Sequence, residues 1–365
     1  MNRTLKSQIL LSLLLLASCK QRTYNDSKAN QTNTTSNQQL SAQSQKLWDK
    51  YVKKTKQLSI QKNCEPTHFA PQPQIKYRGL VIMYHGYTAC PQQYFEWARL
   101  LTQDGFHVLM PLSPGHGLVP KANGDDVTLL PNIAEMNNGF SKYSELVLTM
   151  NEIAKEAEGE KIIVGLSVGG AMATHATILE PNLYDRAIMF APFYSIDDGF
   201  MREVLHILNA FKELPITDPI FKKRHSWGQG CLDERRAGRA GICDFLLGNL
   251  AAAEQYGQDV ISKLNPSAHT QYQFVGSESD KVASVGHIKS TADTLAKLKP
   301  ESVTLCLFKS GANHSLISRF DSPIEDKFWI TSILKHGTQY VSNGTKFPDD
   351  GIDSLVPSIK HCKTE

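Results

Sequence analysis

Ile162-Ile163-Val164-Gly165-Leu166-Ser167-Val168-Gly169-Gly170 is the stretch of sequence that decides the fold. A β-branched run enters a Gly-x-Ser-x-Gly motif, and an alanine-rich segment of helical character follows, which predicts a buried strand turning sharply into a helix. Gly165 and Gly169 would let the backbone fold tightly, so that the Ser167 side chain projects clear of it as a nucleophile. The N–H of Val168 would then lie at a helix N-terminus, where it can stabilise a developing oxyanion.

The succession of strand and helix extends along most of the chain. Apolar, β-branched runs that indicate strands occur at 79–85, 107–112, 161–166, 186–191, 272–276 and 303–308. Apolar residues at three- and four-residue spacing indicate helices at 92–104, 144–157, 168–179, 285–298 and 324–336. We therefore predict an α/β fold, with a mostly parallel sheet flanked by helices on both faces. The segment at about 193–264 breaks this pattern and is predicted to be a partly helical insertion at the edge where the strands end.

Two motifs upstream of the serine show which family the chain resembles. His-Gly-Tyr at 85–87 ends the first predicted strand, and Pro-Gly-His-Gly follows at 114–117. Together with the Gly-x-Ser-x-Gly motif, they make most of the chain between Tyr77 and His336 resemble the α/β-hydrolase family, in particular its bacterial carboxylesterase and monoacylglycerol lipase branch. The resemblance implies the α/β-hydrolase fold, with the insertion at 193–264 acting as a helical lid.

The resemblance also implies roles for residues around the first strand. The N–H of Tyr87, which follows His-Gly, would form the other half of the oxyanion hole. His85 would then be a structural turn residue rather than a base. We interpret His116 in the same way, as a histidine that stabilises its loop.

The two remaining members of a catalytic triad follow from the order that the family uses, which is serine, then an acid, then a histidine after the last strand. Asp280 follows the strand at 272–276, and His314 follows the strand at 303–308. Glu278 is the rival acid, and Asp280 is preferred because Asp-x-Val before a new helix matches the family pattern. Asp280 could alternatively cap that helix, a role that Ser284 can fill instead.

This triad predicts a serine hydrolase that cleaves carboxylic esters of small molecules through an acyl-Ser167 intermediate, with His314 as base and Asp280 as its orienting acid. Two enzymatic alternatives are an acyltransferase and an amidase on the same triad. A surface binding lipoprotein that has lost the activity is the alternative from another class. Cys90 also follows a strand and precedes a helix, so we consider a cysteine nucleophile there as a less favoured possibility.

The overall composition narrows the set of partners. The 365 residues contain 39 Lys plus Arg and 36 Asp plus Glu, a formal charge of +3, which does not favour nucleic acid as a partner. The sequence has no His-Glu-x-x-His pair, no Cys-x-x-Cys pair, no phosphate-binding Gly-x-x-x-x-Gly-Lys and no dinucleotide fingerprint after a strand. We therefore expect neither a metal nor an organic cofactor.

The N-terminus has the pattern of an export signal. Arg3 and Lys6 precede an apolar run at 9–16, and small residues lead to Cys19. The run is too short to span a bilayer, so residues 1–18 are predicted to be a signal peptide. Its end resembles the lipobox of bacterial lipoproteins, in which the cysteine is lipidated. A simple secretory signal with a chance cysteine is the alternative.

The polar composition that follows Cys19 predicts a flexible tether over 19–45, leaving 46–362 as the hydrolase domain. The expected location is that of an exported bacterial lipoprotein at the outer membrane or cell surface. Contact with the membrane would be made through the N-terminal lipid.

The cysteines fit an oxidising compartment, because six of the seven are left once Cys19 is set aside. We predict a disulfide between Cys231 and Cys243 inside the insertion. A second, between Cys64 and Cys90, would clamp the N-terminal stretch beside the oxyanion loop. Cys306 lies in an apolar strand and is expected to be a buried thiol, which leaves Cys362 unassigned.

The insertion contains one amphipathic stretch. Its apolar face is formed by Phe200, Met201, Val204, Leu205, Ile207, Leu208, Phe211 and Leu214. This face is predicted to line the acyl pocket as part of the lid. Ordinary core packing is the alternative use of such a face.

Overall fold

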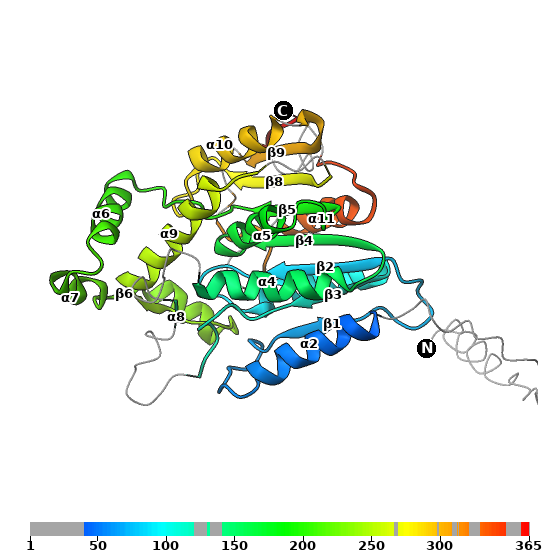
Figure 1. Ribbon diagram of the computed structural model, residues 1–365, viewed down its shortest axis with the longest axis horizontal. Coiled ribbons are helices and arrows are strands. Elements are labelled where there is room, and N and C mark those ends of the chain that lie inside the picture. Colours follow the sequence, from blue (N-terminus) through cyan, green and yellow to red (C-terminus); the bar gives the residue numbers. More distant parts are fainter. Residues whose placement is uncertain are drawn as a thin grey trace, which may run out of the picture. The chain divides into compact units, whose positions relative to one another are not determined.

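A mostly parallel sheet forms the centre of the molecule, and in the described residues its strand order is β1-β3-β2-β4-β5-β8-β9-β10 (Figure 1). The edge strands β1 (Thr67–Phe69) and β10 (Ile359–Thr364) are antiparallel to their neighbours. The parallel strands are β3 (Phe106–Met110), β2 (Gly79–Tyr84), β4 (Glu160–Leu166), β5 (Arg186–Phe190), β8 (Gln271–Ser277) and β9 (Val303–Phe308). Each coincides with one of the six predicted strands, with small shifts at the ends, so the α/β prediction is confirmed.

The structure is a computed structural model that describes residues 40–119, 130–131, 141–265, 269–297, 299–308, 312, 314–320, 329–347 and, for the backbone only, 359–364. These residues belong to one compact unit. The predicted signal peptide, Cys19 and most of the predicted tether lie outside them. Within these ranges, no helix combines the length and the apolar character needed to cross a membrane.

Helices cover both faces of the sheet because successive residues of each strand point to opposite sides. In β2, Leu80, Ile82 and Tyr84 belong to one buried cluster, and Val81 and Met83 belong to the other. The first cluster is covered by α2 (Ala42–Thr55), α4 (Ser141–Lys155), α5 (Val168–Leu179), α9 (Leu247–Ser262) and α10 (Val285–Ala296). The second is covered by α3 (Phe95–Gln103) and α11 (Ile330–Asn343). Short 3-10 turns occur at η1 (Pro91–Tyr94) and η6 (Pro300–Ser302).

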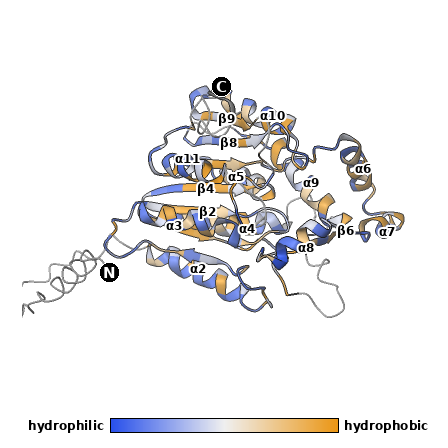
Figure 2. Cartoon of the chain, turned by 180° about the vertical axis from the view of Figure 1, so that it is seen from behind, coloured by the Kyte–Doolittle hydropathy of each residue, from blue (hydrophilic) through white to orange (hydrophobic). Residues whose placement is uncertain are grey.

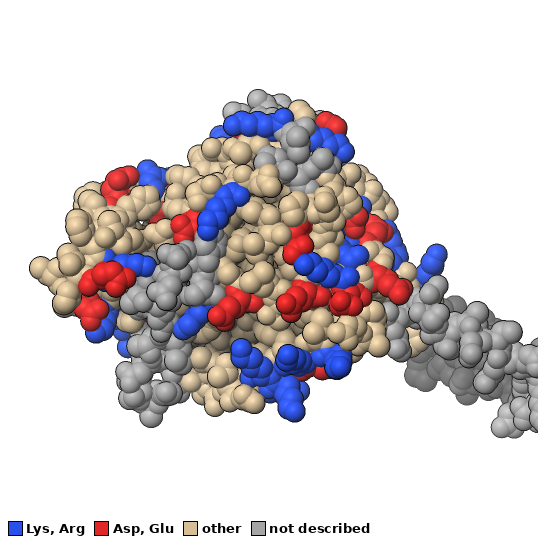
Figure 3. Space-filling view, in the orientation of Figure 1, with Lys and Arg blue, Asp and Glu red and all other residues tan. Residues whose placement is uncertain are grey.

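The folded part begins earlier than predicted, because helix α2 occupies the last residues assigned to the tether. Ser41 caps this helix by accepting a hydrogen bond from the N–H of Ser44 at 3.1 Å. Leu40 and Trp48 are buried in the core. The outer face of α2 carries exposed lysines, and Figure 3 shows blue side chains gathered there while acidic and basic groups are interspersed elsewhere on that face.

The predicted insertion lies between β5 and β8, two neighbouring strands of the sheet. Before α9 it contains α6 (Gly199–Ala210), η5 (Pro215–Thr217), α7 (Asp218–Phe221), β6 (Arg224–Ser226), α8 (Gln229–Arg236) and β7 (Asp244–Leu246). β6 and β7 pair as a separate antiparallel ribbon.

The apolar face predicted for the insertion does not stay together in the structure. Leu205 is buried in the core that α9 shares, whereas Phe200 and Ile207 are 78% and 59% exposed. The helix ends at Ala210, so Phe211 and Leu214 lie beyond it and are also exposed. In Figure 2 the apolar colouring of α6 and α7 is on elements set apart from the sheet. None of the eight residues of this face lines the cavity that Ser167 lines, so the prediction that the face lines the acyl pocket is wrong.

Both predicted disulfides are present, Cys64–Cys90 and Cys231–Cys243. The first removes the free thiol that a nucleophilic Cys90 would need. Cys306 is also disulfide-bonded, which corrects the expectation of a buried free thiol.

Candidate active site

Ser167 is the single residue between β4 and α5, and its backbone is strained. Its φ is 58°, a left-handed conformation that residues with a side chain seldom adopt. A Cβ on Gly165 would lie 1.9 Å from the carbonyl oxygen of Gly169, and a Cβ on Gly169 would lie 2.0 Å from that of Tyr84. Both positions therefore require glycine, and the turn they permit brings the helix N-terminus directly after the serine.

The loops after β8 and β9 bring Asp280 and His314 together. The Nδ1 atom of His314 lies 2.7 Å from Oδ2 of Asp280. The other carboxylate oxygen of Asp280 accepts hydrogen bonds from the N–H groups of Val282 and Ala283, at 2.7 and 3.0 Å. This pairing fixes the proton of the neutral imidazole on Nδ1, so that Nε2 is the acceptor.

Asp280 is held as a carboxylate despite being buried. Burial by itself would raise its pKa, but the charge and hydrogen bond of His314, together with the two backbone donors, outweigh burial and lower the pKa below its ordinary value. Glu278, the rival acid, is exposed and faces Lys289 at 3.9 Å. The geometry therefore pairs His314 with Asp280 and leaves Glu278 at the surface.

Nε2 of His314 is buried and has no hydrogen-bond partner in the described part of the chain. Ser167 and His314 line the same cavity. An acceptor without a partner, on a residue that lines the same cavity as the serine, is available to act as a general base for the serine hydroxyl.

The two expected oxyanion donors lie beside the serine. Val168 is the first residue of α5, so its N–H has no partner within the helix. The loop that carries Tyr87 passes close to the serine, because a Cβ on Gly86 would be 3.4 Å from the Cβ of Ser167. Gln93 fixes this loop by accepting a hydrogen bond from the N–H of Gly86 at 2.8 Å.

His85 and His116 are buried and bonded to the backbone. The N–H of Ser113 donates to Nε2 of His85 at 2.9 Å, and Nδ1 of His85 lies 2.9 Å from the carbonyl oxygen of Gly86. Nδ1 of His116 lies 2.9 Å from the carbonyl oxygen of Pro114. Burial lowers the pKa of His85 to about 3, with a contribution from neighbouring His116, and lowers that of His116 to about 4. Both are neutral residues that hold the turns around the loop that carries Tyr87, called the oxyanion loop below for its expected role.

Buried neutral histidines make the fold sensitive to acid. Burial also lowers the pKa of His175 to about 4 from its ordinary value of 6.5. The unfolded chain takes up protons at these histidines below pH 6.5 and the folded chain does not, so their stabilisation is present above that pH and is lost as the pH falls towards 4. We expect the free energy of unfolding to fall by up to about 1.4 kcal/mol per pH unit for each such histidine. Urea unfolding between pH 7.5 and 5 measures this slope. His175→Gln should reduce it, and a free energy independent of pH over this range would contradict the prediction.

The cavity beside Ser167 has a volume of about 340 Å³. Apolar side chains contribute most of its wall, among them Phe193, Trp227, Leu250 and Val282. Trp227 and Leu250 belong to the insertion, together with the charged residues Glu234 and Arg239. The insertion therefore lines the same cavity as Ser167, through the segment 227–253 rather than through α6.

Comparison with known proteins identifies the family. Residues 75–312 match the model of the serine aminopeptidase S33 family of hydrolases. The chain belongs to this family. The match includes Ser167 and Asp280 and ends just before His314. As a member of the S33 family, the protein is a serine hydrolase with the α/β-hydrolase fold.

Two solved structures of similar fold are those of lipases. The monoacylglycerol lipase of Paleococcus ferrophilus is 15% identical, with 77% of this chain and 98% of that one covered and a TM-score of 0.54. A soluble variant of monoglyceride lipase from Saccharomyces cerevisiae, bound to a substrate analogue, is 13% identical, with 77% and 92% covered and a TM-score of 0.55. A search of curated proteins found no match. At these identities the similarity establishes the fold of this S33 hydrolase and not its substrate.

Sequence reasoning did not identify Arg239 and Glu234 as residues of the site. They lie in a polar run where charged side chains are ordinarily solvated, and only the flanking pair Cys231 and Cys243 indicated a constrained segment.

Among the described residues, no group of three or more His, Cys, Asp or Glu side chains is arranged to hold a metal ion.

Proposed function

We propose that this S33 hydrolase is a carboxylesterase that hydrolyses acyl esters of small molecules through an acyl-Ser167 intermediate. The observation that carries the proposal is the 2.7 Å contact between His314 and Asp280, with the unpartnered Nε2 of His314 buried beside the cavity that Ser167 lines. A nucleophile, a base of fixed tautomer and an orienting carboxylate are thereby available at one cavity.

The reaction would run in two halves. Oγ of Ser167 attacks the ester carbonyl while Nε2 of His314 takes its proton, and the N–H groups of Tyr87 and Val168 hold the oxyanion. Collapse of the resulting tetrahedral intermediate breaks the bond to the alcohol oxygen, and the alcohol leaves with the proton from His314. Water then attacks the acyl-serine, again losing its proton to His314, and the acid is released as Ser167 recovers its proton. Asp280 stabilises the imidazolium formed in each half.

Ester hydrolysis is favoured over amide cleavage and acyl transfer by the nature of the cavity. Its wall is mainly apolar, which suits an acyl chain, and the names of the two structural neighbours reported above are those of lipases. An amidase or acyltransferase would use the same triad. A binding protein without activity would have no use for a histidine held in the tautomer of a base.

The test compares matched leaving groups. We expect the purified chain to hydrolyse p-nitrophenyl esters of graded acyl length, with kcat/KM at least about a hundredfold above that for the p-nitroanilides of the same acids. Release of nitrophenol or nitroaniline is followed by absorbance. Faster cleavage of the anilides would identify an amidase, faster transfer to an added alcohol than to water would identify an acyltransferase, and no turnover would identify a binding protein.

We further propose that the protein is anchored to a bacterial membrane through a lipid on Cys19, on the support of the lipobox-like sequence alone. Acyl chains bind membranes strongly, because each buried CH₂ contributes about 0.8 kcal/mol. We expect the intact protein to partition into detergent, and Cys19→Ser to yield unlipidated protein in the aqueous phase. Mass spectrometry of the mature N-terminus checks this. An unmodified Cys19, or cleavage at another residue, would contradict the proposal.

A further inference from the structure

One corner of the cavity beside Ser167 is charged, in contrast to its apolar walls. Arg239 and Glu234 both line the cavity, and their side chains are only 9% and 19% exposed. A guanidinium that loses this much hydration needs hydrogen-bond acceptors to compensate.

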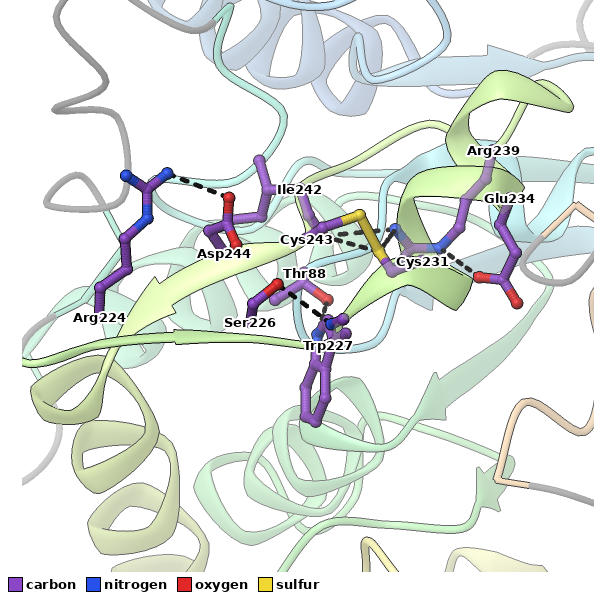
Figure 4. The surroundings of a disulfide bond; sticks show 11 residues. Thr88, Arg224, Ser226, Trp227, Cys231, Glu234, Arg239, Ile242, Cys243 and Asp244 are labelled. Atoms are coloured by element: carbon purple, nitrogen blue, oxygen red, sulfur yellow. Dashed lines mark hydrogen bonds and ion pairs between the residues drawn. A yellow bond between two sulfur atoms is a disulfide. The ribbon is translucent and has the colours of Figure 1, made fainter.

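Protein groups accept only some of the hydrogen bonds that the guanidinium of Arg239 can donate. Its Nη1 lies 3.3 Å from the carbonyl oxygen of Ile242 and 3.3 Å from Sγ of Cys231. Its Nε is 3.8 Å from the Glu234 carboxylate, which is beyond hydrogen-bond distance. Figure 4 shows the guanidinium lying between the Cys231–Cys243 disulfide and Glu234. Within the described chain, Nη2 donates to no protein group, so the Nε–Nη2 edge of the guanidinium has N–H donors without an acceptor at hydrogen-bond distance.

The charged corner is fixed relative to the oxyanion loop. The indole N–H of Trp227 donates to Oγ1 of Thr88 at 2.9 Å, and the N–H of Ile242 donates to the carbonyl oxygen of Thr88 at 2.9 Å (Figure 4). Thr88 directly follows Tyr87, the expected oxyanion donor. A group bound by Arg239 would therefore be held at a set position relative to an ester carbonyl in the oxyanion hole, which is how a remote contact orients a reacting bond.

We propose that Arg239 is a subsite for a carboxylate carried by the ester substrate. A guanidinium edge with free N–H donors matches the two oxygens of a carboxylate, and a partly buried site strengthens that interaction. The apolar wall accommodates the carbon chain between this carboxylate and the ester bond. The substrate class is then an ester with a second, ionised acid group on either its acyl or its alcohol part. Glu234 neutralises Arg239 when no substrate is bound. This inference rests on the proposed esterase activity and narrows its substrate.

The experiment compares esters that differ only in the carboxylate. On the acyl side, 4-nitrophenyl hydrogen glutarate is compared with 4-nitrophenyl pentanoate, and on the alcohol side, 4-carboxyphenyl butyrate is compared with phenyl butyrate. We expect the wild type to favour the anionic ester of one pair by about tenfold or more in kcat/KM. Arg239→Gln should abolish that preference, measured as the ratio of kcat/KM for the anionic ester to kcat/KM for the neutral ester of the same pair. Arg239→Lys, which keeps the charge but loses the fork, should keep only part of it.

Glu234→Gln is the matched control and an independent arm should Arg239→Gln fail to fold. It removes the competing carboxylate and leaves Arg239 in place, so the preference for the anionic ester should rise by about threefold or more. The proposal is overturned if the wild type prefers neither anionic ester, if Arg239→Gln leaves the preference unchanged, or if Glu234→Gln lowers it. In each of these outcomes the neutral esters are still hydrolysed, whereas failure of the proposed function would abolish turnover of every ester.

Discussion

Replacing Ser167 by alanine is expected to lower kcat/KM for p-nitrophenyl esters by on the order of 10⁴-fold or more, and to abolish labelling by a fluorophosphonate. The exchange removes one oxygen and keeps the Cβ, which the strained backbone position after β4 already accommodates. The fold should therefore persist, as judged by circular dichroism and by the midpoint of urea unfolding. Turnover that survives in a folded Ser167→Ala variant would contradict the assignment of the nucleophile.

His314→Ala should be about as damaging as Ser167→Ala, because a nucleophile and its base act as a unit. The double variant should then be little worse than either single one. A double variant that loses activity in proportion to the product of the two single losses would mean that the residues act independently. Their shared cavity and the unpartnered Nε2 of His314 argue against that.

The central fold and the sharp turn that carries Ser167 could be predicted because both depend on local sequence. A strand buried on both faces is a mostly apolar run, as in β2, β4 and β5, whereas β3, β8 and β9 also bury polar residues, namely His107, Gln273, Ser277 and Thr304. The glycines around Ser167 are required by contacts within a single turn. The spacing of residues alone does not decide the acid of the proposed triad, because Asp280 and Glu278 are two residues apart. The contact of His314 with Asp280 is what distinguishes the two carboxylates.

Features that depend on distant contacts escaped prediction. Helix α2 lies in a stretch that reads as polar, since its buried side is small and its remaining residues are mostly charged or amide. The spacing of the apolar residues around α6 correctly predicted a helix but not which element would pack against it. In the structure Leu205 is buried, whereas Phe200 is exposed to solvent. Periodicity identifies a face and does not identify what covers it.

The charged corner of the cavity is the clearest case. Arg239 and Glu234 are five residues apart in a run rich in charge, which ordinarily indicates a solvated surface. They become cavity residues because the Cys231–Cys243 disulfide and the bonds to Thr88 fold this run back over the oxyanion loop. Predicting that Arg239 and Glu234 line the cavity would have required knowing which distant segments contact each other. The spacing of Cys231 and Cys243 was the only indication of such a contact in the sequence.

Asp280→Asn is expected to lower kcat by on the order of 10³- to 10⁴-fold while leaving the loop intact. Asparagine can still accept the N–H groups of Val282 and Ala283 through its oxygen, as Asp280 does. Its amide N–H₂ then faces His314 and can only donate to Nδ1, so the ring proton moves to Nε2 and the base can no longer accept the serine proton. The loss is measured by comparing kcat of the wild type and of the variant in stopped assays at the same enzyme concentration.

Glu278→Gln is the matched control for this prediction, because it makes the same chemical change two residues earlier in the same loop. Glu278 is exposed and its only described ionic partner is Lys289 at 3.9 Å, a distance at which a surface pair contributes little. We therefore expect kcat to change by less than about twofold. If Glu278→Gln costs more than Asp280→Asn, the acid of the triad is Glu278, and the 2.7 Å contact between Asp280 and His314 serves the fold rather than the reaction.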